Sequence, residues 1–156
     1  MNESGPKCDC RECIVRELMF EYTKPSQIQS ICETKREELY KKGSLIVSEN
    51  QEIQNLIYVK EGLVKFHKQV SPGKQQIISI SRAYEFTSLL TNFSEKHYKY
   101  SVSAIEDTTV CIIDLEKIKA LILENGKFAL GLLEKMSKAS DFVISSLTEI
   151  NQKNLR

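Results

Sequence analysis

The spacing of hydrophobic and polar positions changes twice along the chain. Between residues 40 and 113, short runs of β-branched and aromatic residues are bounded by turn residues such as Gly43, Asn50, Gly62 and Gly73. Short strands at this spacing predict an antiparallel roll or barrel. Asn50 is expected to take the left-handed conformation that favours glycine. The runs that we expect to form strands are 45–47, 56–59, 63–66, 77–80 and 110–113.

Helical spacing flanks this β region on both sides. Residues 12–22 carry apolar side chains on one helical face, and Pro25 ends that segment. Residues 26–39 predict a second short helix with a thin apolar face. After the strands, Leu115 starts an amphipathic helix that we expect to end near Asn125-Gly126. The fold class is therefore mostly β with flanking helices (α+β).

The last helix is predicted to run from residue 127 to the end of the chain. Its apolar positions recur in steps of three and four over several turns, as in a coiled-coil seam. The same spacing also fits a helix that packs on the core of its own domain, and periodicity alone does not separate the two. Without a Gly or Pro stop signal, the natural chain is expected to continue past Arg156. The candidate seam residues are Leu132, Met136, Ala139, Val143, Leu147 and Ile150.

Composition narrows the function classes. The 156 residues suffice for one domain with a hydrophobic core, and a net charge of +1 gives no overall electrostatic footprint for nucleic acid. The sequence has no apolar run of membrane-spanning length and a polar N-terminus, so we expect a cytoplasmic protein. His67 and His97 are expected at the surface, and known catalytic motifs are absent from the sequence. Enzyme activity is therefore not expected.

Three ordered motifs resemble the Crp/Fnr family of bacterial transcription regulators. Residues 40–46 are similar to the opening strand and turn, 56–65 to the strand, Glu-Gly turn and strand, and 101–108 to the strand after the phosphate-binding cassette. The resemblance covers roughly residues 35–156. It implies a jelly-roll-like double-stranded β-roll of the cyclic nucleotide-binding type, followed by a long dimerisation helix.

The resemblance also implies how the chain is divided into domains and segments. We expect a Cys-containing helical segment at 1–37, a β-roll effector domain with a short helix at 38–126, and a dimerisation helix at 127–156. In the family a helix-turn-helix follows that helix, so contact with DNA is expected only through a domain missing from this sequence. The implied function is signal reception and transmission through a homodimer. The alternatives are a diverged cyclic-nucleotide-binding module and a ligand-free dimerisation module.

The stretch that corresponds to the phosphate-binding cassette departs from the family. Tyr84 and Ser88 stand at the two glycine positions, and Leu89 stands where an acidic residue binds ribose. The phosphate-pairing arginine falls at or near Tyr98 and Lys99, and lysine lacks the bidentate geometry of arginine. Ordinary cyclic AMP binding is therefore not expected. The effector-pocket candidates are Tyr84, Glu85, Thr87, Ser88, Tyr98 and Lys99.

Five cysteines include a cluster at Cys8, Cys10 and Cys13. Thiolates at such short spacing suit a Fe–S cluster or Zn. The oxygen-sensing Fnr branch combines an N-terminal cysteine cluster with a distant cysteine, and residues 104–111 resemble the strand around that cysteine. The candidate ligands are therefore Cys8, Cys10, Cys13 and Cys111, although Met19 stands where the family has a further ligand. The alternatives are redox-labile thiols near the N-terminus and, for Cys111, a small buried hydrophobe.

Overall fold

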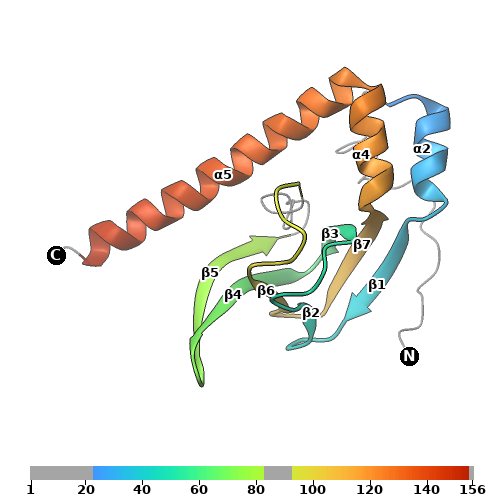
Figure 1. The fold of residues 1–156 in the computed structure, drawn as a ribbon. Helices are drawn as coiled ribbons and strands as arrows, with labels where there is room; N and C mark the ends of the chain where they lie inside the picture. The colour runs from blue at the N-terminus through green and yellow to red at the C-terminus, as the bar shows by residue number, and fades with distance from the viewer. Residues whose placement is uncertain (1–22, 83–92, 155–156) are drawn as a thin grey trace.

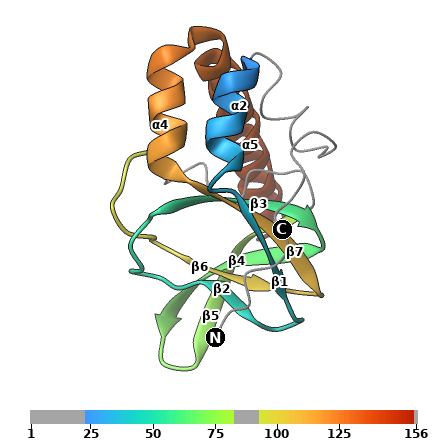
Figure 2. The same cartoon turned by 90° about the vertical axis from the view of Figure 1, so that its right-hand side faces the viewer.

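The computed structural model describes residues 23–82 and 93–154. Two antiparallel sheets form a β-roll, and helices lie at one end of it (Figures 1 and 2). The elements, in chain order, are α2 (Pro25–Cys32), β1 (Arg36–Tyr40), β2 (Leu45–Val47), β3 (Asn55–Glu61), β4 (Leu63–Ser71), β5 (Lys74–Arg82), β6 (Ser101–Ala104), β7 (Thr108–Asp114), α4 (Leu115–Glu124) and α5 (Gly126–Asn154). The predicted fold class, mostly β with flanking helices, is confirmed.

The two sheets have strand orders β1-β7-β3 and β2-β6-β4-β5. Inward-facing side chains of both sheets share one core, in which Val59, Val64, Val110 and Ile112 are almost fully buried. The turns between strands use the residues that the sequence indicated. Asn50 has φ 71° and Gly62 has φ 105°, both in the left-handed region.

The predicted helix at 26–39 is wrong in its second half. The helix α2 ends at Cys32, and residues 36–40 form the strand β1 instead. Pairing with β7 sets Glu38 opposite Val110 and Tyr40 opposite Thr108. On β1, Glu38 binds the Arg36 Nε at 3.1 Å and accepts a hydrogen bond from the Tyr40 hydroxyl at 2.6 Å. Tertiary pairing thus overrides a sequence of helix-forming residues, because a strand gains its stability from neighbours that local propensity does not include.

A second core lies between the sheet β1-β7-β3 and the helices. It unites Ile31 of α2, Cys111 of β7, Ile118 of α4 and Phe128 of α5. Asp114 caps α4 by accepting a hydrogen bond from the Glu116 backbone N–H at 2.9 Å. This core fixes the start of α5 on the roll.

The turn at Asn125-Gly126 lies where the sequence predicted it. Asn125 ends α4, and its side-chain oxygen accepts a hydrogen bond from the Phe128 N–H at 3.1 Å, which caps the next helix. The helix α5 then begins at Gly126 and runs obliquely back past the roll, so that its C-terminal end lies to one side of the sheets (Figure 1). None of the helices in the described residues is long and apolar enough to cross a membrane.

Candidate effector site

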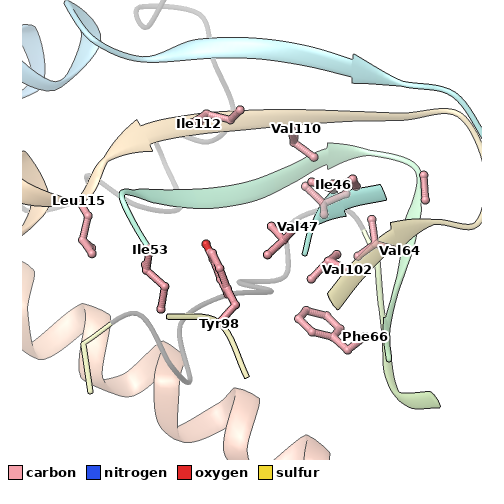
Figure 3. Close-up of a cluster of buried hydrophobic side chains, with 12 residues drawn as sticks. Ile46, Val47, Ile53, Val64, Phe66, Tyr98, Val102, Val110, Ile112 and Leu115 are labelled. Carbon is pink, nitrogen blue, oxygen red and sulfur yellow. The ribbon is translucent and has the colours of Figure 1, made fainter. Parts of the chain in front are cut away.

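The interior of the β-roll is the candidate binding site for an effector. The side chains that line it in the described residues are mainly apolar, and Ile53, Phe66 and Val102 lie around the buried Tyr98 (Figure 3). Tyr98 is 2% exposed, and its hydroxyl donates to the Asn55 backbone oxygen at 3.4 Å. Burial, followed by the neighbouring Tyr100, raises the pKa of the Tyr98 hydroxyl, so this group stays neutral.

Three aromatic rings fill this part of the roll. The centroids of Phe66 and Tyr100 lie 5.0 Å apart at 68°, and those of Tyr98 and Tyr100 lie 6.3 Å apart at 60°. These edge-to-face geometries are favourable for aromatic pairs. At position 98 an entering phosphate would meet a neutral phenol in an apolar core, which offers no charge to stabilise it.

The structure separates the two neighbouring candidates, Tyr98 and Lys99. While Tyr98 points inward, the Lys99 side chain is 62% exposed and pairs with Glu95 at 2.8 Å. The remaining effector-pocket candidates, Tyr84, Glu85, Thr87 and Ser88, lie outside the described residues. The structure therefore does not gather the six candidates into one described site.

His67 is a polar residue of the roll whose burial the sequence did not reveal. We expected it at the surface, but it is only 7% exposed, and that prediction is wrong. Its Nε2 lies 2.7 Å from the hydroxyl oxygen of Ser103, across the pair β4–β6. The pairing of β4 with β6 is continuous from Val64 to His67, so His67 lies on the opposite face of the strand from Phe66 and is buried there.

The cysteines divide between described and undescribed parts of the chain. Cys111 is fully buried in β7, the surroundings that its interpretation as a small hydrophobe predicts. Cys32 lies half-buried on the same core. Cys8, Cys10 and Cys13 lie outside the described residues. Across the described part of the chain, three or more potential metal ligands do not gather anywhere.

The long helix α5 has two parts with different surroundings. Phe128 and Leu132 are buried in the core that the helices share with β7, and Met136 packs against it. Further along, Phe142 is 53% exposed and Ile144 is 61% exposed. The start of the helix packs on its own domain, as one of the two sequence-based interpretations has it. The side chains of the later seam positions Val143, Leu147 and Ile150 lie outside the described part of the structure, so the seam stays a prediction.

Comparison with known protein families identifies the family to which this fold belongs. The sequence profile of the family described as "Cyclic nucleotide-binding domain" matches residues 37–125, from β1 to the end of α4. The chain belongs to this family. The expected β-roll of the cyclic nucleotide-binding type is thereby confirmed, together with the long helix that follows it.

Relatives of this cyclic nucleotide-binding domain include regulators. The chain is 27% identical over 97 residues to the "Anaerobic regulatory protein" of Bacillus subtilis, a match over 62% of this chain and 41% of that protein. It is 25% identical over 96 residues to an uncharacterized protein of Haemophilus influenzae, over 62% of this chain and 74% of that protein. The chain thus spans less than half of the Bacillus regulator.

Solved structures share the fold at low sequence identity. The sensor domain of the transcriptional regulator DNR from Pseudomonas aeruginosa superposes with a TM-score of 0.69 at 17% identity, over 80% of this chain and 89% of that one. FixK2 from Bradyrhizobium japonicum gives 0.65 at 19% identity, over 73% and 56%. Together with the family profile and the Bacillus relative, these structures confirm the resemblance to Crp/Fnr regulators.

Proposed function

We propose that this chain is the sensory domain of a Crp/Fnr-type transcription regulator. A signal received in the β-roll or by the N-terminal cysteines would change the packing of α5 against the α5 of a second copy. That change would reorient DNA-binding domains attached beyond the C-terminal end of this sequence. The proposal accords with the family, with the regulator relatives and with the absence of known catalytic motifs from the sequence.

The observation that carries the proposal is the construction of α5. Phe128 and Leu132 hold the first turns of the helix in the core beside β7 and α4, so movement in the roll is mechanically linked to the helix. Its later turns carry the sequence-predicted seam positions Val143, Leu147 and Ile150, in steps of four and three. Apolar helix surface at steps of three and four favours pairing with another helix.

The oligomeric state tests this function. Sedimentation equilibrium of the chain should show a dimer, and Val143→Glu, on the seam that the sequence predicts, should shift it to monomer. Ile144→Glu is the matched control, because the next residue lies about 100° around the helix on another face. A chain that stays monomeric at high concentration, or a V143E variant that dimerises as well as the parent chain, contradicts the dimer mechanism.

The three N-terminal cysteines, with Cys111, are the candidate ligands for a metal-borne signal. Cys111 shares its core with α2, the helix that follows the cysteine-containing segment in sequence. Anaerobic purification with iron and acid-labile sulfide analysis tests this role. Iron and sulfide in cluster stoichiometry, lost in Cys13→Ser and Cys111→Ser, support a redox sensor. An iron-free dimer contradicts it and directs the search to small molecules.

Cyclic nucleotides are the second class of effector to test, since the family profile carries that name. Buried Tyr98 in the interior and Lys99 at the surface argue against a charged phosphate site there. We expect no change in melting temperature with cyclic AMP or cyclic GMP. A ligand present at 100 times its dissociation constant would add about 2.7 kcal/mol to the free energy of unfolding, which a thermal-shift assay detects readily.

A further inference from the structure

Asn125, the residue between α4 and α5, uses all four of its polar atoms to join three helices. Its backbone N–H donates to the Leu121 carbonyl oxygen of α4 at 2.9 Å, and its own carbonyl oxygen accepts from the Ala129 N–H of α5 at 3.0 Å. Its side-chain Oδ1 accepts from the Phe128 N–H of α5 at 3.1 Å, and its Nδ2 donates to Gln27 Oε1 of α2 at 3.3 Å. One side chain therefore links α2 to the first turn of α5.

Backbone donors fix the orientation of both side-chain amides in this link. A backbone N–H pairs only with the oxygen of a side-chain amide, so the Phe128 N–H turns Oδ1 of Asn125 toward α5 and leaves Nδ2 facing α2. In the same way, the Lys24 N–H donates to Gln27 Oε1 at 3.0 Å, so this oxygen accepts from two donors. The two amides are therefore complementary in one arrangement only, because flipping either of them breaks its bond to the backbone.

The helix α2 depends on its neighbours for its position. It has eight residues, and a helix of that length is not stable in water on its own. Its Ile28 packs in the core that also holds Phe128 of α5, and the Lys117 Nζ of α4 donates to the Ser30 carbonyl oxygen of α2 at 2.8 Å. Figure 2 shows α2, α4 and the start of α5 together at one end of the roll. A displacement of α2 therefore acts on the turn between α4 and α5.

The turn at Asn125 sets the direction in which α5 leaves that end. The backbone of Asn125 is extended, with φ −133° and ψ 98°, so α4 and α5 meet at a bend and not as one continuous helix. The helix α5 has 29 residues and is about 43 Å long at a rise of 1.5 Å per residue. A rotation of about 5° at its start would move its far end by about 4 Å. Small changes at the turn are thus amplified along the helix.

We propose that Gln27 and Asn125 couple the position of α2 to the start of α5. This role rests on the proposed function, in which α5 carries the signal to a second copy. The two residues are positioning residues that bind no effector themselves. When α2 moves, the Gln27 side chain either moves Asn125 with it or loses the hydrogen bond, and both events alter the residue that caps α5 at Phe128. A signal that displaces α2 thereby reaches α5 without passing through the interior of the β-roll.

Backbone hydrogen exchange, followed residue by residue by NMR in the whole chain, tests this contact. Gln27→Met keeps the length of the side chain but removes the oxygen that Asn125 and Lys24 share. Exchange at residues 129–133 should accelerate about threefold or more, as expected for the loss of one hydrogen bond, while exchange in β4 and β6 keeps the rate of the parent chain. Gln29→Met makes the same change at an exposed position of α2 and should leave exchange in α5 unchanged.

A second background separates the hydrogen bond from the apolar core. Asn125→Ser keeps an oxygen that can cap the Phe128 N–H, but its side chain is too short to reach Gln27. In this background Gln27→Met should leave exchange at residues 129–133 unchanged. The proposal is overturned if Gln27→Met has no effect on α5 in the parent chain. It is also overturned if the acceleration is as large with Ser at position 125, because apolar packing alone would then couple the helices.

The outcome of this experiment is distinguishable from failure of the proposed function. Exchange in α5 reports coupling between helices of one copy, whereas the dimer mechanism is judged by sedimentation. A chain that stays monomeric and still shows the Asn125-dependent acceleration would contradict the dimer mechanism and leave this contact standing. A dimer without that acceleration would contradict only the role of Gln27 and Asn125.

Discussion

Gly62, in the turn between β3 and β4, lies directly against the backbone of Thr108 at the start of β7. A Cβ atom on Gly62 would stand 2.7 Å from the Thr108 Cα and 2.8 Å from the Asp107 carbonyl oxygen. Thr108 is fully buried, and its hydroxyl donates to the Glu106 carbonyl oxygen at 2.8 Å. The two turns of neighbouring strands therefore interlock at a point where only a hydrogen atom fits.

Gly62→Ala should destabilise the fold by roughly 2–4 kcal/mol, through strain at φ 105° together with the steric conflict. Urea unfolding measures the loss. Gly73→Ala is the control, because Gly73 has φ 77° but no atom within 4 Å of an added Cβ. Its cost should be only about 1–2 kcal/mol, from conformation alone. Equal losses for the two variants would mean that the contact with Thr108 contributes nothing.

The Gly62 site shows what a sequence can and cannot predict here. The Glu61-Gly62 turn follows from the local spacing of apolar runs, as do the strands around it. The contact with Thr108 joins residues 46 positions apart in the chain, and a single sequence does not report such a distance. The same limit explains β1, whose strand depends on pairing with β7.

The candidate site was predicted less well than the fold. Family resemblance drew attention to position 98, but it could not show that Tyr98 turns into the core while Lys99 turns to solvent. His67 was missed for a different reason. His67 is buried beside Ser103 of the neighbouring strand β6, a contact between residues 36 positions apart, and the polar character of histidine gives no sign of that burial.

His67 should make the stability of the domain depend on pH. Burial, followed by the positive charge of Lys65, lowers the pKa of His67 below its ordinary value of 6.5. Between these two pKa values the unfolded chain binds a proton that the folded chain does not, so the free energy of unfolding should fall as the pH drops below 6.5. The stabilisation is fully present above that value.

Urea unfolding at about pH 7.5 and about pH 5.5 measures this dependence. His67→Gln, which retains a hydrogen-bonding side chain, should lose less stability between the two conditions than the parent chain does. His97→Gln, at an exposed position, should behave like the parent chain. An NMR titration that places the midpoint of the His67 ring above 6.5 would reverse the predicted sign.

Tyr98 should act mainly as a packing residue. Tyr98→Ala removes a ring that is buried among Ile53, Val102 and neighbouring side chains, and it should cost about 3–5 kcal/mol. Tyr98→Phe removes only the hydroxyl, whose hydrogen bond to Asn55 is long at 3.4 Å, and should cost about 1 kcal/mol or less. Thermal unfolding of the two variants separates these effects. A larger loss for Tyr98→Phe would instead assign the stabilisation to the hydroxyl.

Leu132 and Leu133 are neighbours on α5 with opposite surroundings. Leu132 is 5% exposed in the core formed with α4 and β7, whereas Leu133 is 58% exposed. Leu132→Ala should therefore lower the free energy of unfolding by about 2–5 kcal/mol, and Leu133→Ala should change it by about 0.5 kcal/mol or less. The comparison is best made by urea unfolding at several protein concentrations. If Leu132 anchors the helix on its own roll, its loss should be the same at every concentration. A loss that grows as the protein is concentrated would instead place Leu132 in the contact between two copies, because only association depends on concentration.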